Sequence, residues 1–165
     1  MARFKYNPRE FSLLDAGVYV AQVIGGKPGL TKGNADDPEQ YPKLDLTLTT
    51  VPGDRRLFTT IIFGGRGRFT IKRFCDSAEL ELPDCIVEAS LCLEDCLYRI
   101  VYPQVIHKDD GHGIIRAEVK TLYSRESALA INQGLEKIPL PANVPPRAKV
   151  TIVAPNIITM PQAAA

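Results

Sequence analysis

The segment from Lys43 to Thr49 alternates strictly between leucine and polar residues, and no other feature constrains the fold as tightly. Leu44, Leu46 and Leu48 fall on one side of an extended backbone, and the charged and hydroxyl side chains fall on the other. A period of two is typical of a β-strand with one face in the core and one face in water. The segment therefore predicts a strand in a sheet that is packed on one face only.

Four further segments rich in β-branched and aromatic residues are typical of strands. They cover residues 17–24, 55–63, 92–106 and 113–123. Turn-forming residues at 52–54 predict a hairpin that joins the alternating strand to the next one, and Asp110-Gly111 predicts a turn at 108–113. Residues 27–42 are rich in glycine, proline and asparagine, and we expect them to form a loop.

One helix is expected between the third and fourth strands, over residues 68–79. Ile71, Phe74, Cys75 and Ala78 recur at the i, i+3, i+4, i+7 spacing of an amphipathic helix. The order β-β-β-α-β-β across residues 17–123 predicts a mainly β fold. We expect a five-stranded barrel like that of the oligonucleotide/oligosaccharide-binding (OB) fold, although other small β folds share this order.

The chain of 165 residues is long enough for one domain with extensions. We assign residues 1–123 to the barrel domain, with residues 1–14 as an N-terminal arm. Residues 124–165 contain repeated prolines and are expected to form an irregular C-terminal extension. A short helix over 124–135 and one added strand over 149–153 are the regular elements expected in it.

The apolar runs are far shorter than the roughly 20 residues that a membrane-spanning helix requires. The first residues lack the apolar stretch of a secretory signal, so we expect a cytoplasmic protein with no membrane partner. Its cysteines are then expected to be reduced, mostly as buried free thiols. They are Cys75, Cys85, Cys92 and Cys96.

The formal net charge is only +1, but the charges are strongly segregated along the chain. Between Asp54 and Phe74 the charged residues after Asp54 are all basic, whereas between Cys75 and Cys96 all are acidic. The basic residues are Arg55, Arg56, Arg66, Arg68, Lys72 and Arg73. This segregation predicts a molecule with a basic surface despite its near-neutral total, because local charge decides what binds.

Aromatic residues are interleaved with this basic stretch. Proteins that bind single strands combine a positive groove with aromatic rings on which bases stack. Phe58 and Phe63 have opposite parity on the predicted strand, so only one of them can face outward, and Phe74 is expected in the core. An ordinary solvated surface is the alternative. The predicted nucleic-acid-binding residues are Lys27, Lys32, Lys43, Arg55, Arg56, Phe58, Arg66, Arg68, Lys72 and Arg73.

We expect no catalytic site, no cofactor and no metal. His107 and His112 bracket two aspartates in a predicted turn, where Asp and Gly are common for backbone reasons. The glycines at 25–29 lack the spacing of a phosphate-binding loop. A thiol- or metal-dependent enzyme is the least favoured alternative.

Five elements of the sequence occur in a familiar succession: Gly17-x-Tyr19, Thr31-Lys-Gly33, the alternating leucine strand, Gly53–Phe58 and Ile71-Lys-x-Phe74. In this succession the chain resembles a family of short phage and prophage proteins thought to bind single-stranded DNA. The resemblance implies an OB-like barrel, no catalysis, and sequence-tolerant binding during phage replication and recombination in the bacterial cytoplasm. Carried over by position, it implies that Lys32, Arg55 and Arg56 lie near the DNA backbone, while Tyr19 and Leu46 pack in the core.

The partners expected are therefore single-stranded DNA and, beside it, replication or recombination proteins. The alternative is a protein-interaction or structural β-module of a phage assembly that binds no nucleic acid. Such a module would form a homo-oligomer whose interface covers the arginines.

Overall fold

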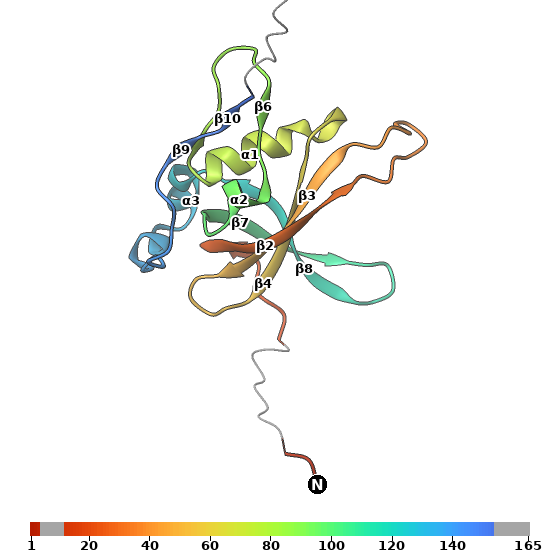
Figure 1. Cartoon of the computed structure of the whole chain (residues 1–165). Coiled ribbons are helices and arrows are strands. Elements are labelled where there is room, and N and C mark those ends of the chain that lie inside the picture. The colour runs from red at the N-terminus through yellow and green to blue at the C-terminus, as the bar shows by residue number, and fades with distance from the viewer. Residues whose placement is uncertain (4–11, 154–165) are drawn as a thin grey trace, which may run out of the picture.

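The computed structural model describes residues 1–3 and 12–153, and its largest element is an antiparallel sheet of six strands. These are β1 (Gly17–Val18), β2 (Ala21–Leu30), β3 (Pro42–Thr50), β4 (Arg56–Ile62), β7 (Ile100–Asp109) and β8 (Ile115–Tyr123). Pairing runs in the order β4-β3-β2-β7-β8, and β1 pairs with β7 next to the start of β2. Figure 1 shows the hairpins β2–β3 and β7–β8 extending beyond the body on the same side.

The alternating strand is confirmed. β3 lies between β2 and β4, and Leu44, Leu46 and Leu48 are at most 4% exposed. Leu57 and Ile61 of β4 are buried beside them, because directly paired residues of neighbouring strands share one face. The opposite face of these strands is partly open to water, as the pattern predicts.

The helix is also confirmed, with slightly different ends. A 3-10 turn, η1 (Gly65–Arg68), leads into α1 (Phe69–Ser77), which packs against β4, β7 and β8. Phe74, Cys75 and Ala78 are buried in the main core. The helix therefore covers part of the main core beside β4, β7 and β8.

The first strand is longer than predicted, so the loop expected at 27–42 begins only after Leu30. Gly25 and Gly26 do not end the strand. Both glycines follow a β-bulge after Val23, and this bulge lets β2 continue beside β3. A Cβ on Gly26 would lie 2.4 Å from the Asp45 carbonyl oxygen, so this glycine permits close approach of two backbones. Lys27 therefore lies on a strand.

The strand predicted at 92–106 is wrong in its first part. Residues Leu93–Cys96 form a single helical turn, α2, which is capped by hydrogen bonds between Cys92 and Asp95. Tyr98 has a φ of 65°, and β7 begins only at Ile100. Apolar spacing in so short a segment fits a strand and a helical turn equally well, and the local cap decides between them. β7 then continues to Asp109, further than expected.

The C-terminal extension is more ordered than an irregular tail. It contains α3 (Arg125–Ile131), the 3-10 turn η2 (Gln133–Lys137), β9 (Ala148–Lys149) and β10 (Thr151–Ile152). β9 pairs with β5 (Leu80–Glu81), and β10 pairs with β6 (Ala89–Ser90). Ala128 and Leu135 are buried in a second core cluster, and Val150 joins the first. Apolar residues between the prolines explain this packing. Most of the arm expected at 1–14, and residues 154–165, lie outside the described residues.

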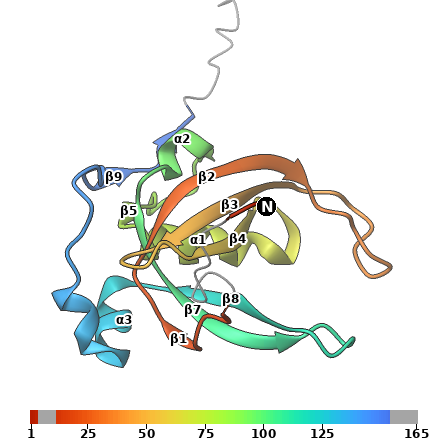
Figure 2. The same cartoon turned by 90° about the horizontal axis from the view of Figure 1, so that it is seen from below.

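The fold is therefore mixed α/β and rich in strands, with two small two-stranded sheets and three α-helices in the described part. β4 and β8 are the ends of the strand order, and their residues lie in contact although no pairing between them is recorded in residues 12–153. Figure 2 shows α1 between the two halves of the sheet. No helix among the described residues has the length and apolarity to cross a bilayer.

Candidate functional site

Two hollows lie along the line where β4 meets β8. One, of about 350 Å³, is lined by residues 12–14, 55–57 and 115–117. The other, of about 330 Å³, is lined by residues 58–61 and 119–122 together with α1 residues between Phe69 and Phe74. Residue numbers increase in the same direction on both strands, so β4 and β8 run parallel along this line. We call it the seam.

Basic and aromatic side chains from three elements meet at the seam. We call this set the seam face: Arg55, Arg56, Phe58, Phe69, Arg73, Arg116 and Lys120. Phe58 is 67% exposed and Phe69 is 53% exposed, values that are unusual for large aromatic side chains. The Arg73 guanidinium lies 4.6 Å from the centre of the Phe69 ring, a cation–π contact that fixes the direction of both groups.

The parity argument for the aromatics is confirmed by this geometry. Phe58 lies opposite Thr47 on the outer face of the sheet, whereas Phe63 packs against the core. Phe74 is completely buried. The strand period thus leaves one phenylalanine of β4 on the surface, next to the first aromatic of α1.

Arg55 and Arg56 occupy the other end of the seam. The Arg55 guanidinium donates hydrogen bonds to the Ser12 hydroxyl, at 3.4 Å, and to the Ser12 carbonyl oxygen. This arginine therefore ties the chain before β1 to the start of β4. Arg56 is exposed, and both arginines lie with Arg116 around the same hollow.

Lys27 and Lys43 do not belong to the seam face. They lie on β2 and β3 next to Asp45, and Lys43 forms an ion pair with Asp45 at 3.0 Å. Burial acts to raise the pKa of Asp45, but hydrogen bonds from Thr60 and Lys43 outweigh it, so the pKa is lowered. These two lysines therefore surround a carboxylate of the chain itself.

Lys32, Arg66 and Arg68 are elsewhere again. Lys32 is exposed in the β2–β3 connection, and Arg66 lines a hollow of about 200 Å³ that also contains Asp36, Asp37 and Glu39. Arg68 donates to the Gly65 carbonyl oxygen at 3.3 Å. None of these three lines the seam hollows, so the structure does not bring the ten residues together in one place, and a role of these three in binding nucleic acid stays a prediction.

The acidic half of the β2–β3 connection folds back onto Tyr41. The Tyr41 hydroxyl donates to Glu39 at 3.0 Å and to Asp37 at 3.2 Å, and these bonds raise the pKa of Tyr41 to about 12. The ring lies over Gly64 and Gly65, where a Cβ would come within 2.2 and 2.6 Å of it. These glycines are therefore required for packing of the hairpin.

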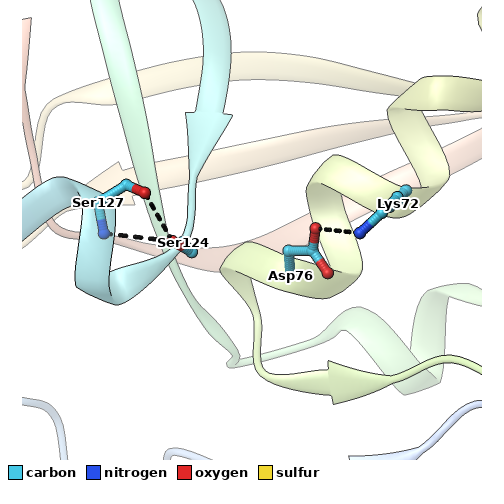
Figure 3. A network of polar contacts seen from close by, with 4 residues as sticks. All are labelled: Lys72, Asp76, Ser124 and Ser127. Atoms are coloured by element: carbon cyan, nitrogen blue, oxygen red, sulfur yellow. Dashed lines mark hydrogen bonds and ion pairs between the residues drawn. The ribbon is translucent and has the colours of Figure 1, made fainter.

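Lys72 is also removed from the site. Its ammonium group donates to Asp76 at 2.8 Å, one turn further along α1, and this contact raises the pKa of Lys72. Figure 3 shows the pair on α1 and the Ser124–Ser127 hydrogen bonds at the start of α3 nearby. Lys72 therefore forms an ion pair within α1.

The histidine turn has a structural explanation. Asp109 and Asp110 accept hydrogen bonds from backbone N–H groups of residues 111, 112 and 114, as turn aspartates commonly do. His107 Nε2 lies 2.8 Å from the Leu14 carbonyl oxygen. Within residues 1–3 and 12–153, no three His, Cys, Asp or Glu side chains are arranged to hold a metal.

The cysteines divide into two kinds. Cys75 and Cys96 are fully buried, and burial raises their pKa values to about 11 and about 12. Cys85 and Cys92 are exposed, and the hydrogen bond from Cys92 to Asp95 raises the pKa of that thiol. Raised pKa values disfavour the thiolate and hence nucleophilic chemistry at these three positions.

Phe69, Arg116 and Lys120 are the seam-face residues that are absent from the predicted set. Arg116 and Lys120 alternate with Glu118 on the exposed face of β8, a pattern that reveals an exposed face but not its neighbour. Only the contact of β8 with β4 brings them to the seam. No protein-family model matches the chain, and no curated protein is detectably similar to it in sequence. The resemblance to phage proteins therefore stays a prediction.

Proposed function

We propose that the protein is a non-catalytic, OB-like binder of single-stranded DNA that holds the strand along the seam face. The observation that carries this proposal is the pair of exposed rings, Phe58 and Phe69, in one hollow with Arg73 and Lys120. Two such rings offer stacking surfaces to successive bases, and every base has a face that can stack. Binding of this kind tolerates any sequence.

The fold supports the proposal. An OB barrel has five strands with a helix between the third and fourth, and its ligands lie on the face of strands two and three between two hairpin loops. The order β4-β3-β2-β7-β8 and the place of α1 match that description, with β4 and β8 as the strands that would close the barrel. The hairpins β2–β3 and β7–β8 correspond to the two loops.

The positions of charged side chains indicate the path of the bound DNA strand. Asp45 lies on the outer face of β3, where its ion pair with Lys43 takes up the charge of that lysine. The cations of the seam face lie to the side of it, at the β8 edge. A DNA strand is therefore expected to follow β4 and β8, with its phosphates near Arg55, Arg56 and Arg116 and its bases near the two rings. A role in phage replication or recombination is part of the proposal and is supported by the resemblance alone.

The test is a fluorescence-anisotropy titration of the full chain with labelled oligo-dT and with a duplex, at several salt concentrations. The logarithm of the binding constant should fall with the logarithm of salt at about −0.7 per phosphate contact, hence about −3.5 if all five seam-face cations take part. The duplex should bind more weakly, because its bases are not free to stack. A flat salt response, or no binding at low salt, would exclude the proposal.

A further inference from the structure

An apolar patch stands on the surface where β6 meets β10. Ile86 is fully exposed, and Val87, Ile152 and Val153 are more than a third exposed. The two segments are adjacent, because Ile152 pairs with Ala89 and the Val153 N–H donates to the Glu88 carbonyl oxygen at 2.9 Å. Single exposed apolar residues are ordinary, but a contiguous group of them marks a contact surface. We call these four residues the knob.

The segment that carries Ile86 and Val87 is acidic. No lysine or arginine occurs between Phe74 and Arg99, and the exposed carboxylates of Asp84 and Glu88 flank these two residues in the sequence. Glu81 lies opposite Lys149 of β9, so its charge has a cation beside it. The ion pairs found among the described residues use neither Asp84 nor Glu88. A partner for this surface should therefore offer exposed apolar side chains beside positive charge.

The same chain displays exposed rings and positive charge together at the seam. The space of about 330 Å³ is lined by Phe58, Phe69 and four threonines, and Arg73 and Lys120 also line it. In Figure 1, β6 and β10 lie on one side of α1, and β4 and β8 lie on the other. The two surfaces of one molecule thus face different ways, but two molecules can bring them together.

We propose that the knob of one copy docks into the seam hollow of a second copy, with Ile86 between the two phenylalanine rings and the carboxylates of the knob facing Arg73 and Lys120. Such a contact joins two different surfaces, so it repeats from copy to copy and builds either a ring or an open filament. It also covers the seam face. The association itself is independent of DNA, and only its competition with single strands rests on the proposed function.

The experiment is sedimentation of the nucleic-acid-free full chain over a range of concentrations. Salt of about 10 mM and about 1 M changes the screening length from about 30 Å to about 3 Å. Species larger than the monomer should form with rising concentration at low salt and dissociate at high salt. A protein that stays monomeric at low salt, up to the highest soluble concentration, overturns the inference.

Single substitutions test whether the knob takes part in the association. Ile86→Asp should weaken the association about tenfold or more, because it removes a buried apolar contact. Ile131→Asp is the matched control, since Ile131 is 58% exposed on α3, away from both surfaces. Ile86 is fully exposed, so its replacement leaves the fold intact, which a thermal melt verifies. Equal effects of the two variants, or no effect of either, overturn the inference.

Charge exchange gives a sharper test. The pair Asp84→Lys with Glu88→Lys, and the pair Arg73→Glu with Lys120→Glu, should each abolish self-association. Each variant keeps one native surface. Mixing them allows the altered knob to meet the altered seam, and the native knob of the second variant to meet the native seam of the first, so assemblies that contain both variants should form. If mixing restores nothing, the knob does not dock at the seam. Oligo-dT binding without self-association would leave the proposed function standing, and self-association without oligo-dT binding would do the reverse.

Discussion

Removing the ring of Phe58 should separate DNA binding from folding. The side chain is 67% exposed, so about a third of its surface is buried in the fold. A fully buried aromatic removes about 150–250 Å² from water, so this third corresponds to about 50–80 Å². At about 25 cal/mol per Å², Phe58→Ala should lower the free energy of unfolding by about 1–2 kcal/mol at most.

Phe58→Ala should also weaken DNA binding, through the loss of a stacking surface. Loss of one stacked base weakens single-strand binding by about 1–3 kcal/mol, which corresponds to a rise in Kd of about 5- to 150-fold. Phe58→Trp should restore affinity, because the larger ring still stacks. Ile131→Ala serves as the control for truncation of an exposed apolar residue elsewhere.

The assay is anisotropy with labelled oligo-dT, accompanied by urea unfolding of each variant. The reasoning about the seam is refuted if Phe58→Ala binds oligo-dT as tightly as the unaltered chain. It is also refuted if Ile131→Ala loses as much affinity as Phe58→Ala, because the loss would then not come from the seam.

Three further predictions concern the core. Leu46→Ala should cost about 2–5 kcal/mol in urea unfolding, because the side chain is buried beside β4, and a loss below 1 kcal/mol would contradict this. Ser77→Ala should cost about 1–3 kcal/mol, since the Ser77 hydroxyl accepts a buried hydrogen bond from the Tyr102 N–H at 2.9 Å; an unchanged urea midpoint would be the contrary result. Burial raises the pKa values of Cys75 and Cys96 above the unfolded value of about 9, to about 11 and about 12. Their contribution to the free energy of unfolding is therefore complete below pH 9 and is lost as pH rises through the two raised values. The stability of Cys75→Ala should depend less on pH in that window, and a pH profile identical to that of the unaltered chain would count against the assignment.

The sequence predicts what depends on local periodicity. Leu46 and Phe74 are buried as expected, since a strand period and a helix period each assign an inward face without knowledge of the partner. The strand period also requires Phe58 and Phe63 to face opposite ways, but it does not say which of them is exposed. Residue pattern alone therefore identifies most of the sheet and α1.

The same pattern cannot tell which elements become neighbours. Lys43 appeared available for phosphates, but its ion pair with Asp45 depends on side-chain geometry within β3. Arg66 lies beside carboxylates because the β2–β3 connection folds toward it. Lys120 belongs to the seam because β8 lies next to β4, far away in the sequence. Tertiary contacts thus select four of the ten predicted residues and add three others.

The pairing of β9 and β10 with β5 and β6 has a practical consequence for handling the protein. β9 and β10 are synthesised after β5 and β6, so Leu80 and its neighbours lack these partners until the chain has reached residue 152. A stop codon placed before Ala148 to trim the proline-rich end would take Val150 out of the core and leave two strand edges bare. Such edges recruit other chains, so a chain shortened before Ala148 is expected to aggregate more readily than one that keeps these strands.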